Sequence, residues 1–302
     1  MRKLKSDLRE THYPYGLCVA AINVFTGQPV CAVIGDYKCS ERSLLSQILP
    51  KFASGDFSLL DRGLGGNKVY TEHEACGQHF IHRTKTTGER VAQYTRDFLA
   101  SGKKQRKYWI ALSDAASGKT QQMRTRLPSG PLDGEGKPIV FVTNLIAKEK
   151  YPKKEIIELY QKRWTCETLF NRIKNLLKLE SFHAKTYNGV MQKIFANLLN
   201  LWLAAAAVSA VIEEDKMDPT IEQPNFKNAT EVVKRHLQKI IDQKSSKQKP
   251  SEVRNQILRE VRAVKYKIRP NRSHPRVSTQ PIQGWNLKRS TKLKTFLEKN
   301  VA

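Results

Sequence analysis

YQKRWTCETLFNRIK, residues 160–174, is the most informative stretch of this sequence. At about 100° per residue, four of its polar residues fall within an arc of roughly 60° on one face of an α-helix. The four are Tyr160, Arg163, Glu167 and Lys174, and a stripe of apolar residues lies beside them. A carboxylate can bind a divalent cation, while guanidinium, ammonium and phenol groups can hold phosphate. The pattern therefore predicts a site for metal and phosphate at the border of a buried face.

A second interpretation of the same stretch is an ordinary amphipathic helix. Arg163 and Glu167 are four residues apart, which is the spacing of an intrahelical ion pair on a solvated face. Spacing alone leaves both interpretations open. In either case the periodicity predicts one helix from Lys153 to about Leu179.

Upstream, β-prone segments and turn signals predict how the chain reaches a second acidic residue. Residues 17–25 and 28–35 form a predicted hairpin joined at Thr26-Gly27. A helix is expected to begin at residues 40–42 and to end before Pro50. The short strand 57–60 then leads into Asp61, at the strand's carboxyl end.

The remaining segments alternate between β-like and helical patterns. Residues 78–145 predict β-structure with one short helix near 89–100, and they include the basic run KKQRK at 103–107. A further helix is predicted from about 189 to 214. The basic tail from 216 onward predicts one helix between flexible segments.

The charge balance points to a polyanionic partner. The 302 residues include 53 Lys and Arg against 28 Asp and Glu, a formal net charge of +25. Such a surface favours nucleic acid, although ribosomal and membrane-surface proteins share this balance. The hydrophobic content of 39% is enough to fill a core, which excludes disorder throughout.

Cysteine usage and hydropathy indicate a cytoplasmic protein. The five cysteines are scattered without any close pair, as expected of free thiols in a reducing compartment. The most apolar run, residues 198–212, is shorter than the roughly 20 residues of a spanning helix, so we expect a buried core helix and no membrane.

The quoted stretch resembles the Y-R-E-K signature of IS-four family DDE transposases of bacterial insertion sequences, with all four positions filled. The likeness continues through Thr143-Asn144-Leu145, through YPKKEIIELYQKRW at 151–164 and through KLESFHAK at 178–185. The segment DFSLLDRGLGG at 56–66 resembles the part of the family that carries the second catalytic Asp. The resemblance covers roughly residues 13–275.

The resemblance implies an α/β fold: a ribonuclease H-like core, a mixed sheet with flanking helices, interrupted by a β-rich insertion. By this comparison residues 1–77 form the N-terminal part of the core and 78–150 the insertion. Residues 151–215 then form the C-terminal helical part of the core, and 216–302 a basic C-terminal tail with a helix.

The resemblance also implies the chemistry of DNA transposition. In the family, three carboxylates hold two Mg or Mn ions that promote in-line phosphoryl transfer on DNA. Asp61 matches the second carboxylate and Glu167 the third, so both are expected to be catalytic and to bind metal, with Tyr160, Arg163 and Lys174 contacting DNA. The implied partners are double-stranded DNA at the terminal repeats and at the target, near the nucleoid. A homodimer in the DNA complex is compatible with this.

The sequence departs from the family at the first catalytic Asp. No Asp-Gly-Ser/Thr segment lies before the hairpin, and neither candidate, Asp7 nor Asp36, lies on a matching strand. We therefore expect an N-terminally truncated chain that lacks the first core strand and whose cleavage and strand transfer are impaired. Two alternatives are a non-catalytic DNA-binding remnant and a metal-dependent nuclease without strand transfer. An RNA-binding protein is disfavoured because no RNP-like or KH-type motif stands out.

Histidine and tryptophan positions suggest structural roles. The seven histidines lack zinc-like grouping, since His79 and His82 have no cysteine partners at a suitable spacing. The tryptophans are expected in the core rather than as base-stacking platforms. They are Trp109, Trp164, Trp202 and Trp285.

Overall fold

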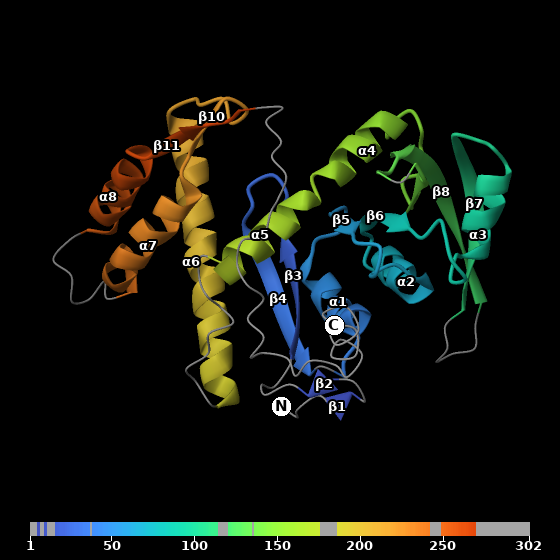
Figure 1. Cartoon of the computed structure of the whole chain (residues 1–302), viewed down its shortest axis with the longest axis horizontal. Coiled ribbons are helices and arrows are strands. Elements are labelled where there is room, and N and C mark those ends of the chain that lie inside the picture. Colours follow the sequence, from blue (N-terminus) through green and yellow to red (C-terminus); the bar gives the residue numbers. More distant parts are fainter. Residues whose placement is uncertain are drawn as a thin grey trace, which may run out of the picture. The chain divides into compact units, whose positions relative to one another are not determined.

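The computed structural model (Figure 1) describes residues 5–6, 9–10, 16–36, 38–113, 120–134, 136–175, 186–241 and 249–269. They divide into two compact units. The sheet unit comprises Cys18–Ile34 and Cys39–Arg172, and the helical unit comprises Met1–Leu17, Gly35–Lys38 and Ile173–Ala302.

A mixed five-stranded sheet forms the centre of the sheet unit, in the order β5-β6-β9-β8-β7. β5 and β6 run parallel, and the other neighbours are antiparallel. This mixed sheet with its flanking helices confirms the expected α/β class. The strands within the expected insertion, residues 78–150, belong to the same sheet as β5. The domain boundaries stay predictions. The strands are β5 (Phe57–Leu60), β6 (His79–Thr84), β7 (Gln105–Ser113), β8 (Thr120–Leu132) and β9 (Pro138–Thr143).

Three further strand pairs lie outside this sheet. The predicted hairpin is confirmed as β3 (Gly16–Ile22) and β4 (Pro29–Asp36), which form a two-stranded sheet of their own. Its turn closes through the Asn23 amide, which donates to the Gln28 carbonyl at 2.9 Å, and Gly27 adopts a φ of 70°. The other pairs are β1 (Lys5–Ser6) with β2 (Arg9–Glu10), and β10 (Glu222–Pro224) with β11 (Lys265–Lys267).

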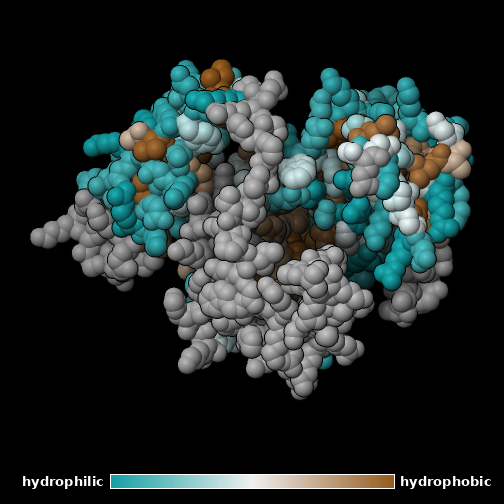
Figure 2. Space-filling model, viewed as in Figure 1, coloured by the Kyte–Doolittle hydropathy of each residue, from teal (hydrophilic) through white to brown (hydrophobic). Residues whose placement is uncertain are grey.

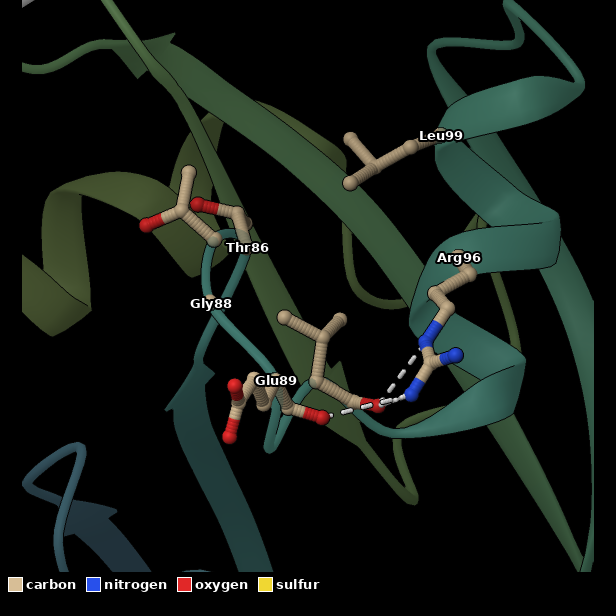
Figure 3. A pocket seen from close by; sticks show the side chains of 7 residues that line it. Thr86, Gly88, Glu89, Arg96 and Leu99 are labelled. Carbon is tan, nitrogen blue, oxygen red and sulfur yellow. Dashed lines mark hydrogen bonds between the residues drawn. The ribbon is translucent and has the colours of Figure 1, made fainter.

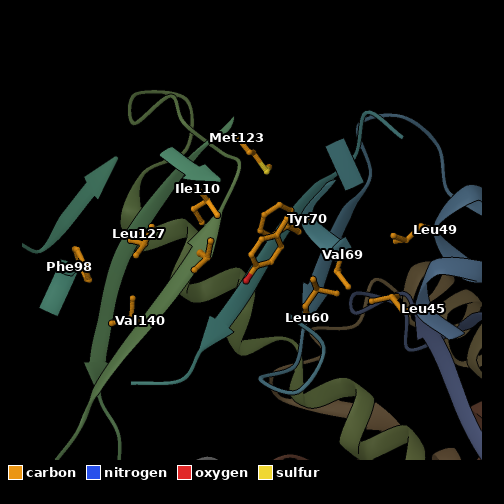
Figure 4. Packing of buried hydrophobic residues seen from close by; sticks show 12 residues of the cluster. Leu45, Leu49, Leu60, Val69, Tyr70, Phe98, Ile110, Met123, Leu127 and Val140 are labelled. Atoms are coloured by element: carbon orange, nitrogen blue, oxygen red, sulfur yellow. The ribbon is translucent and has the colours of Figure 1, made fainter. Parts of the chain in front are cut away.

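Helices cover both faces of the five-stranded sheet. On one face, the inward side chains of the strands pack with α1 (Glu41–Ile48), the short helix η1 (Leu49–Lys51), α2 (Asn67–Ala75) and α3 (Gln93–Ala100), as Figure 4 shows in part. Tyr70 of α2 stacks on Phe80 of β6 with ring centroids 4.6 Å apart. The helices predicted at 40–49 and near 89–100 are thus confirmed as α1 and α3.

The opposite face is covered by α4 (Lys153–Gln161), through a second buried cluster that joins Ile81 and Phe141 to Ile156 and Tyr160. Because alternate residues of a strand point to opposite faces, Phe80 belongs to the first cluster and Ile81 to the second.

The predicted single helix from Lys153 to Leu179 is wrong. α4 ends at Gln161, and α5 spans Trp164–Asn175 after a tight turn in which the Arg163 amide donates to the Tyr160 carbonyl at 3.0 Å. Tyr160 therefore does not share a helix face with Glu167. Neither residue of the turn, Lys162 nor Arg163, is Gly or Pro, so no local signal marked the break.

The helical unit contains α6 (Tyr187–Glu214), α7 (Phe226–Ile241) and α8 (Pro250–Arg262), whose apolar faces form one core. The predicted helix at 189–214 is confirmed as α6, whereas the described part of the tail contains two helices and not the one predicted. α6 has the length and apolar composition that a membrane-spanning helix needs. Ala204, Ala207 and Val211 of α6 are buried in the core that it shares with α7 and α8. The visible faces of α7 and α8 are mainly hydrophilic (Figure 2).

Three tryptophans are exposed, so the expectation that they lie in the core is wrong. Trp109, Trp164 and Trp202 are 62%, 64% and 43% exposed. Trp285 lies outside the described residues.

Candidate active site

Asp61 occupies the position expected from the sequence, directly after the carboxyl end of β5. Leu60 is buried in the core of the sheet unit, whereas the Asp61 side chain is 59% exposed. A turn follows in which the Leu64 amide donates to the Asp61 carbonyl at 2.9 Å. The buried strand thus fixes the backbone, and the carboxylate faces solvent.

Tyr160 anchors the end of α4 to this same point. Its hydroxyl donates to the Leu60 carbonyl at 3.1 Å, and its ring packs against Phe141. Burial raises the pKa of Tyr160 to about 12, against the opposing effect of the Arg163 charge. The phenol is therefore a neutral donor to backbone. The predicted contact of Tyr160 with DNA stays a prediction, and in this structure its hydroxyl has another partner.

Arg163 joins the two predicted catalytic carboxylates. One terminal nitrogen lies 3.5 Å from Oδ1 of Asp61, and the other lies 2.8 Å from Oε1 of Glu167. Burial alone would lower the pKa of Arg163, but the hydrogen bond to Glu167 and the nearby negative charges raise it. The Arg163 side chain is only 15% exposed, and its two acidic partners keep the guanidinium charged despite this burial. Two residues that are far apart in the sequence are thus brought to one place.

Of the other candidates from the sequence, Asp36 is described in full. Lys174 lies on α5, but its side chain is outside the described part of the chain, as is all of Asp7. Asp36 ends β4, where its Oδ1 accepts from the Lys38 amide. Within the described residues, no three His, Cys, Asp or Glu side chains are grouped so that they could hold a metal ion.

Two residues that the sequence did not single out hold the loop that carries Asp61. Nε of Arg42, on α1, donates to the Gly63 carbonyl at 3.2 Å. Nε2 of His82, on β6, lies 3.4 Å from the Arg62 carbonyl. No sequence pattern indicated this role for His82, because it depends on the strand register that pairs His82 with Leu60.

His82 is a neutral, buried support. Its Nδ1 lies 2.6 Å from the Tyr70 hydroxyl, and burial lowers its pKa to about 4. A neutral ring that accepts from Tyr70 at Nδ1 must carry its proton on Nε2, which can then donate to the Arg62 carbonyl. The histidine excluded as a zinc ligand thus contacts the Asp61 loop.

A family model described as "Transposase DDE domain" matches residues 5–203, more than half of the chain. The chain belongs to this transposase DDE domain family. The putative transposase InsL of insertion sequence element IS186A from Escherichia coli (strain K12) is 28% identical over 85 residues, 28% of this chain and 20% of that protein. The transposase of insertion sequence element IS421 from Escherichia coli matches to the same extent. The matched segment spans only a fifth of the length of these relatives.

A solved structure of the piggyBac transposase synaptic complex with hairpin DNA aligns with 92% of this chain and 54% of that one. The sequence identity is 7% and the TM-score is 0.43.

DDE transposases use divalent metal ions, and the two carboxylates of this DDE domain suit one such ion. Arg163 contacts Oδ1 of Asp61 and Oε1 of Glu167, which leaves the second oxygen of each side chain to a cation. Mg²⁺ prefers oxygen ligands and is commonly held by one or two carboxylates, with water and substrate phosphate completing its shell. Asp61 and Glu167 could therefore hold one ion together.

The cavity shown in Figure 3 is lined by none of these site residues. It has a volume of about 340 Å³ and lies between the loop after β6 and α3. Arg96 points toward that loop and donates to the carbonyls of Val91 and Glu89. The Arg96 guanidinium therefore holds the loop between β6 and α3 through its backbone carbonyls.

Proposed function

We propose that this chain acts on the ends of an insertion sequence as a DNA transposase, with Asp61 and Glu167 as metal-binding catalytic residues. The observation that carries the proposal is the Arg163 bridge, which joins carboxylates from β5 and α5 in one exposed pair. A structural ion pair on a solvated helix needs only Arg163 and Glu167. The inclusion of Asp61, which the family resemblance implies as the second carboxylate, favours a site.

Each residue has a distinct part in this proposal. A divalent ion at the pair supplies Lewis-acid stabilisation of the phosphoryl group and activation of the attacking oxygen. Arg163 offsets the repulsion between the two carboxylates, because its guanidinium contacts both of them. Tyr160 fixes the end of β5, and the Arg42 and His82 contacts fix the loop that follows. Arg163 and Lys174 are expected to contact a DNA phosphate, as the family resemblance implies.

We further propose that catalysis by this chain is impaired. A two-metal mechanism in this family uses three carboxylates, and the described residues bring only two together. The alternative is a non-catalytic DNA-binding remnant, which the net charge of +25 also favours. Both predict DNA binding, and they differ in whether any cleavage occurs.

The test is cleavage of duplex DNA carrying the ends of the element that encodes this chain, with Mg²⁺ or Mn²⁺. Weak cleavage that Asp61→Asn and Glu167→Gln each abolish supports the transposase. The matched control is Glu158→Gln, because Glu158 is an exposed acid of α4 that pairs with Lys154. Cleavage that survives Glu167→Gln contradicts the proposed site, and DNA binding without any cleavage supports the remnant.

A further inference from the structure

The β7–β8 ribbon has an outer face that the core does not use. Ile110 and Met123 point inward and are buried. Side chains alternate along a strand, so Trp109 and its cross-strand partner Arg124 lie on the other face. The Arg124 guanidinium lies 6.0 Å from the centroid of the Trp109 ring, within the range of a cation–π contact.

This face ends where α4 begins to cover the sheet. Arg126 lies on the same side of β8 as Arg124, but it is fully buried. It donates to the Tyr151 carbonyl at 2.6 Å and to Gln105 at 2.7 Å. Beyond it, Lys107 and Trp109 are exposed to solvent. The segment before α4 therefore covers Arg126 and leaves Trp109 uncovered within the sheet unit.

The exposed face carries positive charge, and its own two strands contribute no acidic residue. β7 and β8 contain no Asp or Glu, and Lys103 and Lys104 lie just before β7. Among the described residues, none of the side chains of Lys103, Lys104, Lys107 and Arg124 pairs with a carboxylate. Arg163, by contrast, is already paired with two. A bound polyanion thus finds free cations on the ribbon.

We propose that this outer face, with Lys107, Trp109 and Arg124 at its centre, binds a single DNA strand with at least one unpaired base. Phosphates contact the two cations, and a base stacks on Trp109. A duplex hides its base faces, whereas a single strand offers both a stacking surface and phosphates. The proposal rests on the proposed function only in taking DNA as the partner, because the site lies on other elements than Asp61 and Glu167.

The test uses the full chain, a fluorescently labelled oligodeoxynucleotide of mixed sequence, its duplex, and the RNA of the same sequence. Trp109→Ala should weaken binding of the single strand by about 5- to 100-fold, which corresponds to loss of one stacked base. Duplex binding should change less than about twofold. Trp109→Phe should restore most of the affinity, because it keeps an aromatic face. Trp202→Ala, which removes an exposed Trp of α6, is the matched control and should leave both affinities unchanged.

The charge contribution is read from salt dependence. Lys107→Ala and Arg124→Ala should each lower the slope of log affinity against log salt by about 0.7 for the single strand. A thermal melt of each variant verifies folding.

Equal losses for Trp109→Ala and Trp202→Ala would overturn the proposal, as would a preference for duplex or for RNA. These outcomes leave the role of Asp61 and Glu167 intact, because cleavage is assayed separately with variants of those two residues.

Discussion

Gly65→Ala is a sharp test of the support beneath the Asp61 loop. A Cβ at Gly65 would lie 2.0 Å from Cε1 and 2.1 Å from Nε2 of His82. Ordinary carbon contacts are about 3.5–4.0 Å, so either the ring or the loop must move by roughly 1.5 Å. The imidazole has no free space, because it is 4% exposed and is held between Tyr70 and Arg62.

The magnitude follows from these contacts. Overpacking of a core site costs about 1–3 kcal/mol, and a strained or lost buried hydrogen bond adds about 1 kcal/mol. We therefore expect Gly65→Ala to lower the free energy of unfolding by about 2–4 kcal/mol, measured by urea denaturation. Gly134→Ala is the control, because a Cβ there meets nothing within 4 Å, and its effect should stay below about 0.5 kcal/mol.

A double-mutant cycle assigns the effect to the histidine. His82→Ala removes the ring that the new methyl group meets, so the Gly65→Ala penalty should shrink by about 1–3 kcal/mol in the His82→Ala background. If the two changes were additive within about 0.5 kcal/mol, the loop would not be supported by His82 and the reasoning would be refuted.

Two other predictions concern the same contacts. Tyr160→Phe removes the hydrogen bond to Leu60 and should cost about 1 kcal/mol of unfolding free energy, whereas Tyr187→Phe, at a residue 59% exposed, should cost almost nothing; equal effects would deny Tyr160 its anchoring role. The pKa of His82 is lowered from 6.5 to about 4, so its contribution is fully present above pH 6.5 and is lost as the pH falls toward 4. Urea denaturation across this window should show a stability loss of up to ~3 kcal/mol that is smaller in His82→Gln, and an unchanged pH profile in that variant would contradict the assignment.

Local signals predicted much of the frame around the site. The hairpin followed from two β-prone runs around Thr26-Gly27, and α1 from its Ser40 cap, whose hydroxyl accepts from the Ser43 amide. The place of Asp61 at the end of a strand followed from residues 57–60, whereas its proposed role came from the family resemblance. These features depend on neighbours within a few residues, which is the information that a single sequence carries.

The remaining features depend on contacts between distant segments. The turn between α4 and α5 lacks Gly or Pro, and it coincides with the anchoring of Tyr160 on β5. Whether Arg163 pairs with Glu167 alone or also with Asp61 is decided by the tertiary fold. The apolar character of Trp109 suggested burial, but its exposure could not be predicted. It depends on which face of β7 other segments cover.

Mn²⁺ binding to the full chain and to Asp61→Asn, Glu167→Gln and the double variant, measured by titration calorimetry, tests the central claim most directly. If the two carboxylates hold one ion, each single change should weaken Mn²⁺ affinity at least about tenfold, as loss of one of two protein ligands. The loss of Mn²⁺ binding free energy in the double variant should then be much smaller than the sum of the two single losses. Unchanged affinity in both single variants, or two effects that simply add as for separate sites, would contradict the claim that Asp61 and Glu167 form one metal site.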